Sequence, residues 1–173
     1  MNSKKIPPFP ELIAGINHSA IHLEMRDAYL PDNPNFLKWK ETGSLDHIDF
    51  STWRRTISDA VARGVVFRRA RIVSEPIADY IRYEYALTEL YNVAAGEQVR
   101  WLPRRQASDL ALPGNDFWVF DGRLIRFHHF AGDGSIVEDE LCDDPAVIQL
   151  CVSAFESVWE RAVDHSVYKP VQL

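Results

Sequence analysis

Alternating apolar and polar positions mark the strands of this chain. Around His22 the apolar residues Ile21, Leu23 and Met25 recur every second position, a period that favours a strand over the competing helix. Six segments are predicted to be strands because they alternate in this way or are rich in β-branched residues. They are residues 19–29, 65–73, 98–102, 117–120, 123–130 and 135–141. Gly-containing turn signals separate the last three, so we expect an antiparallel meander there.

Apolar residues at three-and-four spacing mark the helices. Ser51 suits the N-cap of a helix that ends at Gly64, and Pro76 suits the first turn of another that ends near Tyr91. Pro145 follows two aspartates and opens the last helix, where acidic side chains favour the positive end of the helix dipole. Shorter helical segments are predicted at residues 11–17, 35–40 and 104–110.

The order of these segments predicts the fold class. Helices alternate with the first three strands, the meander follows, and one helix ends the chain. This order predicts an α/β fold, with α+β as the alternative, built on a mixed, partly parallel sheet with helices packed against it. A chain of 173 residues has the length of one domain of roughly 100–200 residues. We therefore expect a single domain over residues 1–173, with a Pro-rich lead at 1–10 and a core from about 18 to 165.

Composition predicts a cytoplasmic protein. Hydrophobic residues make up 46% of the chain, as in ordinary globular proteins. Prolines follow Lys4 and Lys5 too closely for a signal peptide, and no apolar run approaches the ~18 residues of a membrane span. Cys142 and Cys151 are therefore expected to be reduced. We expect no contact with a membrane.

Charge is unevenly distributed along the chain, although the formal net charge is only −6. Residues 51–105 contain ten arginines, no lysine and six acidic residues, whereas residues 106–173 contain four basic and twelve acidic residues. Arginine suits planar, bidentate contacts with carboxylate or phosphate groups. The simplest expectation is that the basic middle pairs with the acidic C-terminal third, and the alternative is that it binds an anion.

The first candidate site is the corner at Ser74-Glu75-Pro76, where a predicted strand meets a predicted helix. Ligands of open α/β sheets collect at the carboxyl ends of strands, and the free N–H groups of a helix start bind anions. Alternation places Arg69 and Arg71 on one face of the strand and Arg68 on the other. In the alternative, Ser74 only caps the helix and the arginines pair with acidic residues of the chain. The candidate ligand-binding residues are Arg69, Arg71, Ser74, Glu75, Tyr80, Arg82 and Arg100.

Other polar residues give weaker signals. Asp116 and Asp121 lie at opposite ends of one predicted strand, some 16 Å apart at ~3.3 Å per residue, too far to share a proton or a metal ion. His128 and His129 are adjacent in a strand and so face opposite sides. No metal site and no cofactor are expected.

Signatures of several chemistries are missing from the sequence. It contains no GxGxxG, GxxxxGK[ST], GxSxG or CxxC motif, and neither cysteine has an evident activating histidine. Arginines interleaved with aromatic residues are one feature of nucleic-acid binding. The pI near 5.5 and the acidic C-terminal third argue against direct binding of nucleic acid.

Four blocks of sequence carry a resemblance to a known family. They are RRARIVSEPIADYIRYEYALT, NVAAGEQVRWLPR, LPGNDFWVFDGRLIRFHHFAGDG, and DDPAVI with FESVWERA. They resemble an uncharacterised actinobacterial family, a domain of unknown function whose genes often lie beside small helix-turn-helix regulators. The likeness extends from about His18 to about His165. It implies a cytoplasmic role in regulation, with a helix-turn-helix regulator as protein partner, and it transfers no catalytic residue.

The layout from Val99 to Phe130 is also similar to half of a phospholipase-D-like domain, in which a strand bears the motif HxKxxxxD. Aligning the aspartate of that motif with Asp121 places Gly114 at its histidine and Asp116 at its lysine. Without the histidine there is no nucleophile, and without the lysine the phosphate loses its charge partner. The similarity therefore implies a degenerate version that binds or regulates and does not hydrolyse.

We interpret the sequence first as a non-enzymatic regulatory or ligand-sensing module that binds an anionic small molecule or a partner protein at the arginine-rich corner. One alternative is an enzyme acting on a phosphate-bearing or nucleotide substrate at that corner, with Glu75 or Asp79 as the base. Another is an interaction partner of a DNA-binding regulator. A cavity with a perturbed carboxylate beside two arginines would favour the enzyme. A corner fully paired by the protein's own acids would favour the interaction module.

Overall fold

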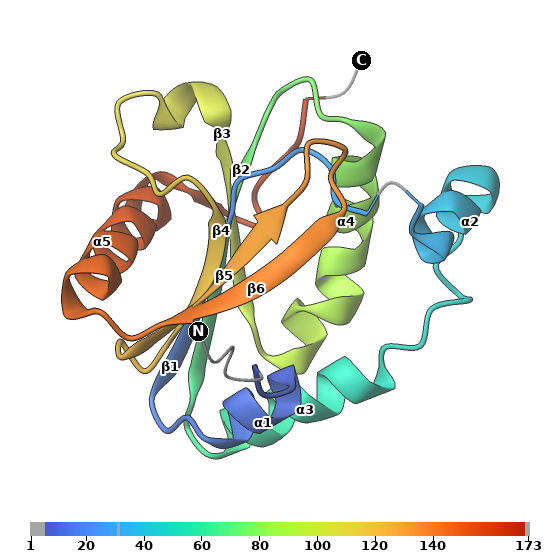
Figure 1. Ribbon diagram of the computed structural model, residues 1–173. Coiled ribbons are helices and arrows are strands. Elements are labelled where there is room, and N and C mark those ends of the chain that lie inside the picture. The colour runs from blue at the N-terminus through green and yellow to red at the C-terminus, as the bar shows by residue number, and fades with distance from the viewer. Residues whose placement is uncertain (1–5, 31, 172–173) are drawn as a thin grey trace.

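A mixed sheet of seven strands lies at the centre of the structure (Figure 1). The computed structural model describes residues 6–30 and 32–171. The strand order across the sheet is β6-β5-β4-β1-β2-β3-β7. The strands are β1 (Ser19–Glu24), β2 (Val66–Val73), β3 (Gln98–Pro103), β4 (Asp116–Phe120), β5 (Leu124–Phe130), β6 (Ile136–Cys142) and β7 (Val163–Asp164).

Parallel and antiparallel pairings divide this sheet. Strands β1, β2 and β3 are parallel neighbours, whereas β4 pairs antiparallel with the other side of β1 and continues into the meander β4-β5-β6. The two-residue strand β7 pairs antiparallel with β3. The predicted α/β fold, with a mixed sheet and a meander before the last helix, is confirmed.

Helices cover both faces of the sheet (Figure 1). Helix α5 lies on one side, and α3 and α4 lie on the other. No helix in the described part of the chain is long and apolar enough to cross a membrane. The helices are α1 (Phe9–Ala14), α2 (Pro34–Thr42), α3 (Ser51–Ala62), α4 (Asp79–Tyr91) and α5 (Pro145–Arg161), with short 3-10 helices at Val93–Ala95 and Arg104–Ala107.

Several helix starts follow from the local sequence, and others differ from the prediction. The Asp144 side chain accepts hydrogen bonds from the N–H groups of Ala146 and Val147 and so caps α5, as expected for the acidic start of that helix. Helix α4 begins at Asp79 and not at Pro76, because the preceding residues are held in an extended connection to other segments. Helix α1 begins at Phe9, inside the predicted Pro-rich lead.

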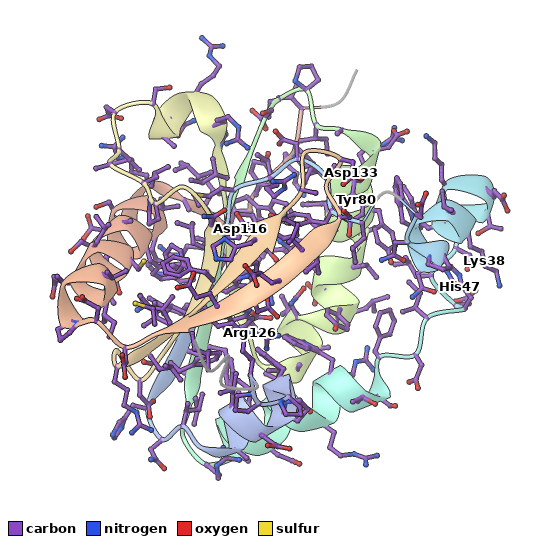
Figure 2. The ribbon with its side chains drawn as sticks, viewed as in Figure 1. Lys38, His47, Tyr80, Asp116, Arg126 and Asp133 are labelled. Atoms are coloured by element: carbon purple, nitrogen blue, oxygen red, sulfur yellow. The ribbon has the colours of Figure 1, made fainter. Side chains whose placement is uncertain are left out.

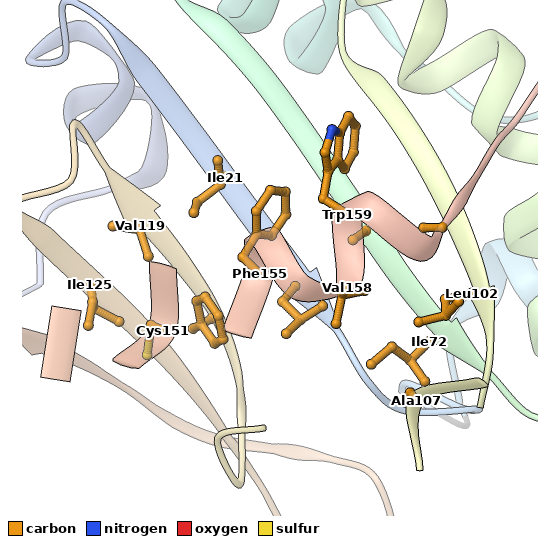
Figure 3. Packing of buried hydrophobic residues seen from close by; sticks show 14 of the residues in the cluster. Ile21, Ile72, Leu102, Ala107, Val119, Ile125, Cys151, Phe155, Val158 and Trp159 are labelled. Atoms are coloured by element: carbon orange, nitrogen blue, oxygen red, sulfur yellow. The ribbon is translucent and has the colours of Figure 1, made fainter. Parts of the chain in front are cut away.

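The face of the sheet toward α5 is a continuous apolar core (Figure 3). Phe155 and Val158 of α5 pack there with strand residues such as Ile21 and Ile72. The opposite face carries two smaller apolar clusters, one involving α1 and α3 and the other involving α4 and the C-terminal segment. Along β2 the first cluster contains Phe67 and the second contains Val73. The strand residues between these two clusters are polar, and the candidate site is built from them.

Candidate functional site

Alternation along β1 and β2 places four polar side chains on the α4 face of the sheet. Successive strand residues point to opposite faces, so Ile21 and Leu23 enter the core beneath α5 while the residues between them face α4. The register aligns His22 with Arg69 and Glu24 with Arg71. All four of these polar residues are buried. The prediction that Arg69 and Arg71 share one face of the strand is therefore confirmed.

Glu24 binds both arginines. Its Oε1 accepts a hydrogen bond from Arg69 Nη1, and its Oε2 accepts one from Arg71 Nε. Arg69 Nε also donates to Glu97 Oε1 at 2.9 Å, and Arg71 Nη1 donates to Thr88 Oγ1 at 2.7 Å. Burial raises the pKa of Glu24, but the two guanidinium groups outweigh burial and hold this pKa well below its usual range. The pair of arginines is thus fixed in place by a carboxylate that stays ionised.

The contacts with Glu24, Glu97 and Thr88 use two of the three side-chain nitrogens of each arginine. Neither Nη2 has a hydrogen-bond partner within residues 6–30 and 32–171. Arg69 and Arg71 both line a cavity of about 330 Å³ between the sheet and α4. We call this the arginine cavity. Its other walls include Tyr80, Tyr83, Glu84 and Leu87 of α4.

Glu84 gives the arginine cavity a titratable group. Its Oε2 lies 3.8 Å from Arg71 Nε, is buried, and has no hydrogen-bond partner among the described residues. Burial raises the pKa of Glu84 to about 7, although Arg71 opposes this rise. A carboxyl group with a pKa near 7 can bind or release a proton at neutral pH.

Aromatic side chains close one side of the arginine cavity. Phe36 of α2 packs against Tyr80 and Tyr83 of α4, with ring centroids 5.0 and 5.6 Å away, and Trp39 lies 5.5 Å from Tyr83. Residues 33 and 35, at the start of α2, also line the cavity. Helix α2 therefore covers the arginine cavity through contacts between rings.

A second cavity, of about 180 Å³, lies on the other side of Glu24, toward the meander. We call it the histidine cavity. Its polar lining residues are His22, Tyr29, Asp116 and His128, together with Glu24, which lines both cavities. Figure 2 shows Asp116 over the middle of the sheet and Tyr80 on the side of α4.

Asp116 is a second buried carboxylate of the histidine cavity, in addition to Glu24. Its Oδ1 accepts a hydrogen bond from the Met25 N–H at 2.9 Å, and its Oδ2 accepts one from the Tyr29 hydroxyl at 2.5 Å. Burial, with the charge of Glu24, raises the pKa of Asp116 to about 6, although both hydrogen bonds oppose the rise. At pH 7 this group is therefore mostly ionised inside the protein.

Two histidines lie beside Asp116. His22 stacks on Trp118 with a centroid distance of 4.2 Å, and burial together with Arg69 lowers its pKa well below the usual value, so the imidazole is neutral. His128 Nδ1 lies 2.5 Å from Asp139 Oδ1. The ring centroids of His22 and His128 are 5.8 Å apart. Burial lowers the pKa of His128 as well.

The predicted corner at Ser74 is closed by the protein itself. The Ser74 N–H and hydroxyl donate to the Asp27 carboxylate at 2.7 and 2.6 Å, and Arg104 Nη2 lies 3.2 Å from the same carboxylate. The prediction that Ser74 caps a helix or meets a ligand at a helix start is wrong, because Asp27 takes the place of the anion and α4 begins five residues later.

The other predicted site residues separate into two groups. Arg69, Arg71 and Tyr80 line the arginine cavity. Glu75 accepts a hydrogen bond from the Tyr168 hydroxyl at 2.6 Å, and Arg82 is exposed and pairs with Asp79. Arg100 lies on the opposite face of the sheet, where its Nη1 donates to the Trp159 carbonyl at 2.9 Å. The expected convergence of all seven residues on one corner is therefore wrong.

Sequence reasoning missed several residues of the two cavities. The alternation of β1 already predicts that His22 and Glu24 share one face of the sheet. Had the sequence also shown that β1 and β2 are neighbours, it would have placed these two residues beside the arginines. Nothing local indicated Glu84 or Asp116, because their burial depends on the packing of α4 and of the loop around Tyr29. Asp116 and His128 were considered from the sequence and set aside, and the residues not proposed for a site at all are His22, Glu24, Tyr29 and Glu84.

These features define an α/β domain with two cavities on one face of a mixed sheet, both of them beside buried polar side chains. Residues 7–170 match the family described as a domain of unknown function (DUF6879), and the chain belongs to that family. A comparison with curated proteins gave no match.

Solved structures with a similar arrangement include TrmBL2, an archaeal chromatin protein with a novel mode of DNA binding, at 16% sequence identity and a TM-score of 0.48. This likeness covers 89% of the present chain and 48% of the other, so the chain spans about half the length of that protein. Another is Nuc, a phospholipase D family member from Salmonella typhimurium, at 11% identity and a TM-score of 0.49, covering 90% of this chain and 86% of that one. At these values neither likeness bears on function.

Proposed function

We propose that this domain is a ligand-sensing module that binds a small molecule through an anionic group in the arginine cavity. The observation that carries the proposal is the pair of Nη2 groups of Arg69 and Arg71, which lack partners among the described residues and belong to side chains that line the cavity. The volume of about 330 Å³ is at the lower end of the roughly 300–1,000 Å³ of small-molecule sites.

The cavity is already organised for an anion. Glu24 holds both guanidinium groups and Glu97 holds one of them, so their side-chain rotamers are fixed before a ligand arrives. Because these donors are already ordered, the free energy of binding does not include the cost of ordering them. Glu24 and Glu97 already pair with the two arginines, and Asp49 and Glu84 also line the cavity, so a singly charged group such as a carboxylate fits better than a phosphate dianion.

Glu84 links binding to protonation. An anion beside Arg71 lies close to Glu84 and favours the uncharged form of that side chain. Binding near pH 7 is therefore accompanied by uptake of a proton. Calorimetry of one ligand in buffers with different ionisation enthalpies measures this uptake.

A thermal-shift screen with carboxylates, nucleotides and phosphorylated metabolites tests the proposal. A ligand at about 100 times its Kd stabilises the native state by roughly 2.7 kcal/mol, which corresponds to a rise in Tm of about 5–10 °C for a chain of this size. Leu87→Phe narrows the arginine cavity and should abolish the shift. Leu90→Phe, on the same helix but with an exposed side chain outside the cavity lining, should preserve it. The proposal fails if no anion raises the Tm or if both variants respond like the unmodified protein.

An enzyme at the same cavity is the second candidate, and Glu84 is the observation that favours it. A carboxyl group with a pKa of about 7 beside Arg71 has the properties of a general base. The bases expected from the sequence do not take this place, because Glu75 binds Tyr168 and Asp79 is on the exterior. Glu84→Gln would keep ligand binding and abolish turnover in an enzyme. Recovery of the bound ligand unchanged after incubation with the unmodified protein supports the sensing module.

A further inference from the structure

Strand β6 leaves one edge of the sheet open. It is the last strand in the sheet order and pairs only with β5. Within residues 6–30 and 32–171 no backbone hydrogen bond joins residues 136–142 to any segment other than β5. The opposite edge is formed by β7, which has only two residues. The backbone N–H and C=O groups along the outer side of β6 can therefore pair with a strand of another molecule.

Apolar side chains lie exposed at the hairpin end of β6. Ile136 and Val137 are 50% and 63% exposed. Leu30, which is 39% exposed, is joined to this hairpin by its N–H, which donates to the Gly134 carbonyl at 3.3 Å. Ile136 and Leu30 also line the histidine cavity, together with Phe130. Exposed apolar surface that is clustered in this way is typical of places where another molecule binds.

The same edge is strongly acidic. Residues 131–160 contain eight acidic residues and no lysine or arginine. Three of the eight, Glu138, Asp139 and Glu140, are consecutive in β6. Asp139 pairs with Arg126, whereas Glu138 is exposed and forms no ion pair in the described part of the chain. The open edge therefore carries negative charge that the protein balances only in part.

The register of β6 separates these acidic side chains from the apolar ones. Glu140 lies opposite Phe127, which packs against the core beneath α5, and alternation places Glu138 on the same face. Ile136 lies opposite Phe130 on the other face, at the histidine cavity. Alternate residues of a strand added beside β6 would thus meet Glu138 and Glu140 on one face and Ile136 on the other.

The negative charge distinguishes among possible occupants of this edge. A second copy of the chain would bring the acidic side chains of two β6 strands together, and like charges across a strand pair are destabilising. Charged side chains on an edge strand prevent pairing between copies for this reason. Nucleic acids and anionic membranes are repelled by the same groups. A partner strand with lysine or arginine at alternate positions is instead attracted to Glu138 and Glu140.

We propose that β6 binds an extended basic segment of a partner protein, which joins the sheet as an additional strand. Main-chain hydrogen bonds to the outer side of β6 supply affinity, and the alternating side chains of the segment supply specificity. Strand β6 forms one edge of the sheet, whereas the arginine cavity lies between the sheet and α4. The interaction therefore does not depend on the function proposed above.

An NMR titration with a synthetic peptide tests the proposal. The peptide has seven residues, the length of β6, with lysine and valine alternating and both ends blocked. Saturable chemical-shift changes are expected for the amides of β6, and slower hydrogen exchange of these amides would show that new backbone hydrogen bonds form. A peptide with proline in place of valine keeps the charge but cannot complete the ladder of hydrogen bonds. A peptide with glutamate in place of lysine controls for the sign of the charge. Equal binding of either control peptide, or no saturable binding of the lysine peptide, would overturn the proposal.

A pair of charge reversals locates the interaction. Glu138→Lys changes an exposed side chain of β6 and should weaken binding of the lysine peptide about tenfold. Glu160→Lys makes the same change at an exposed position of α5 and should leave binding unchanged. Equal affinities of the two variants sink the assignment. Sedimentation of the unmodified protein without peptide tests the other occupant, and a dimer that Glu138→Lys alters would assign this edge to a second copy of the chain.

Discussion

At the scale of single residues, Glu24 connects the two cavities and the two buried arginines. Glu24→Gln removes the charge that Arg69 and Arg71 share, and one of two buried guanidinium groups then lacks an ionised carboxylate at contact distance. We expect the free energy of unfolding to fall by about 3–5 kcal/mol in urea denaturation.

A matched control lies on the other face of the sheet. Glu156 forms a bidentate pair with Arg68 at 2.6 and 2.9 Å, but both side chains are partly exposed. Glu156→Gln should therefore cost roughly 0–1 kcal/mol. Similar losses in the two variants would show that burial does not govern the strength of these pairs.

Glu84 predicts a pH dependence of stability. Its pKa is about 7 in the folded protein and 4.5 in the unfolded chain, so the folded state holds the proton more tightly. The contribution of Glu84 to the free energy of unfolding therefore decreases as the pH rises from about 4.5 to about 7, and it is constant above that range. Glu84→Gln removes this dependence.

Urea denaturation of both proteins across this pH range measures the effect. The variant should gain on the order of 2 kcal/mol relative to the unmodified protein between pH 4.5 and pH 7.5. Because every other titratable group is shared, the difference between the two curves isolates Glu84. A constant difference across the range would contradict the raised pKa.

The sequence predicted the position of a side chain correctly where the alternation of a strand determines its face. It failed where contacts between distant segments determine the position. Alternation correctly placed Arg69 and Arg71 together and Arg68 opposite. The same rule applied to Arg100 did not show that this residue faces α5, because the register between β2 and β3 was unknown. Ser74 was misjudged because its partner, Asp27, lies in a distant loop.

At the scale of elements, α2 is joined to the remainder of the domain mainly by aromatic contacts. None of its residues is fully buried, and Figure 1 shows it at the periphery beyond α4. Phe36 and Trp39 contact Tyr80 and Tyr83, and one exposed ion pair joins Lys40 to Asp79 at 3.0 Å. Helices with few buried contacts open more often than the core. Opening of α2 would give a ligand access to the arginine cavity.

Hydrogen exchange followed by mass spectrometry tests this behaviour. Amides of α2 should exchange faster than those of β2 and α4, and Trp39→Ala should accelerate exchange in α2 without affecting β2. Leu37→Ala, at an exposed position of the same helix, is the control. Ligand binding in the arginine cavity should slow exchange in α2. Equal protection of α2 and β2 would contradict independent opening.

The sequence predicted most elements because their patterns are local. The six strands and the long helices were found, with ends displaced by a few residues. Strand β7 was missed because two residues carry no period, and its pairing with β3 is set by the path of the chain after α5. Helix α4 begins later in the chain than predicted because the segment around Pro76 is hydrogen-bonded to the C-terminal segment. No local signal in the sequence indicates that contact.

At the scale of the whole molecule, the uneven charge is paired differently from the simplest expectation. The buried arginines bind Glu24, Glu84 and Glu97, which lie in the first and middle segments of the chain, and not the acidic C-terminal third. Arg68 is the exception among these pairs, with Glu156 of the acidic C-terminal third as its partner. Composition therefore identified the arginines as important but did not identify their partners, because pairing follows the sheet order and not the order of the sequence.

The C-terminal segment closes the molecule over the edge of the sheet. Tyr168 is buried and stacks on Trp101 with a centroid distance of 5.6 Å, and its hydroxyl donates to Glu75 at 2.6 Å. The Ile77 N–H donates to the Val171 carbonyl at 2.9 Å. Glu75, expected from the sequence to contact a ligand, thus anchors the end of the chain.

Removal of the Tyr168 ring should therefore destabilise the whole domain. We expect Tyr168→Ala to lower the free energy of unfolding by about 3–5 kcal/mol, the usual cost of deleting a buried aromatic side chain. Tyr168→Phe, which loses only the hydrogen bond to Glu75, should cost about 1–3 kcal/mol, because an acceptor is left partly buried. Val167→Ala, at an exposed neighbour, should have almost no effect. Urea denaturation followed by tryptophan fluorescence ranks the three variants, and a loss for Tyr168→Ala no larger than for Val167→Ala would show that the C-terminal segment does not stabilise the fold.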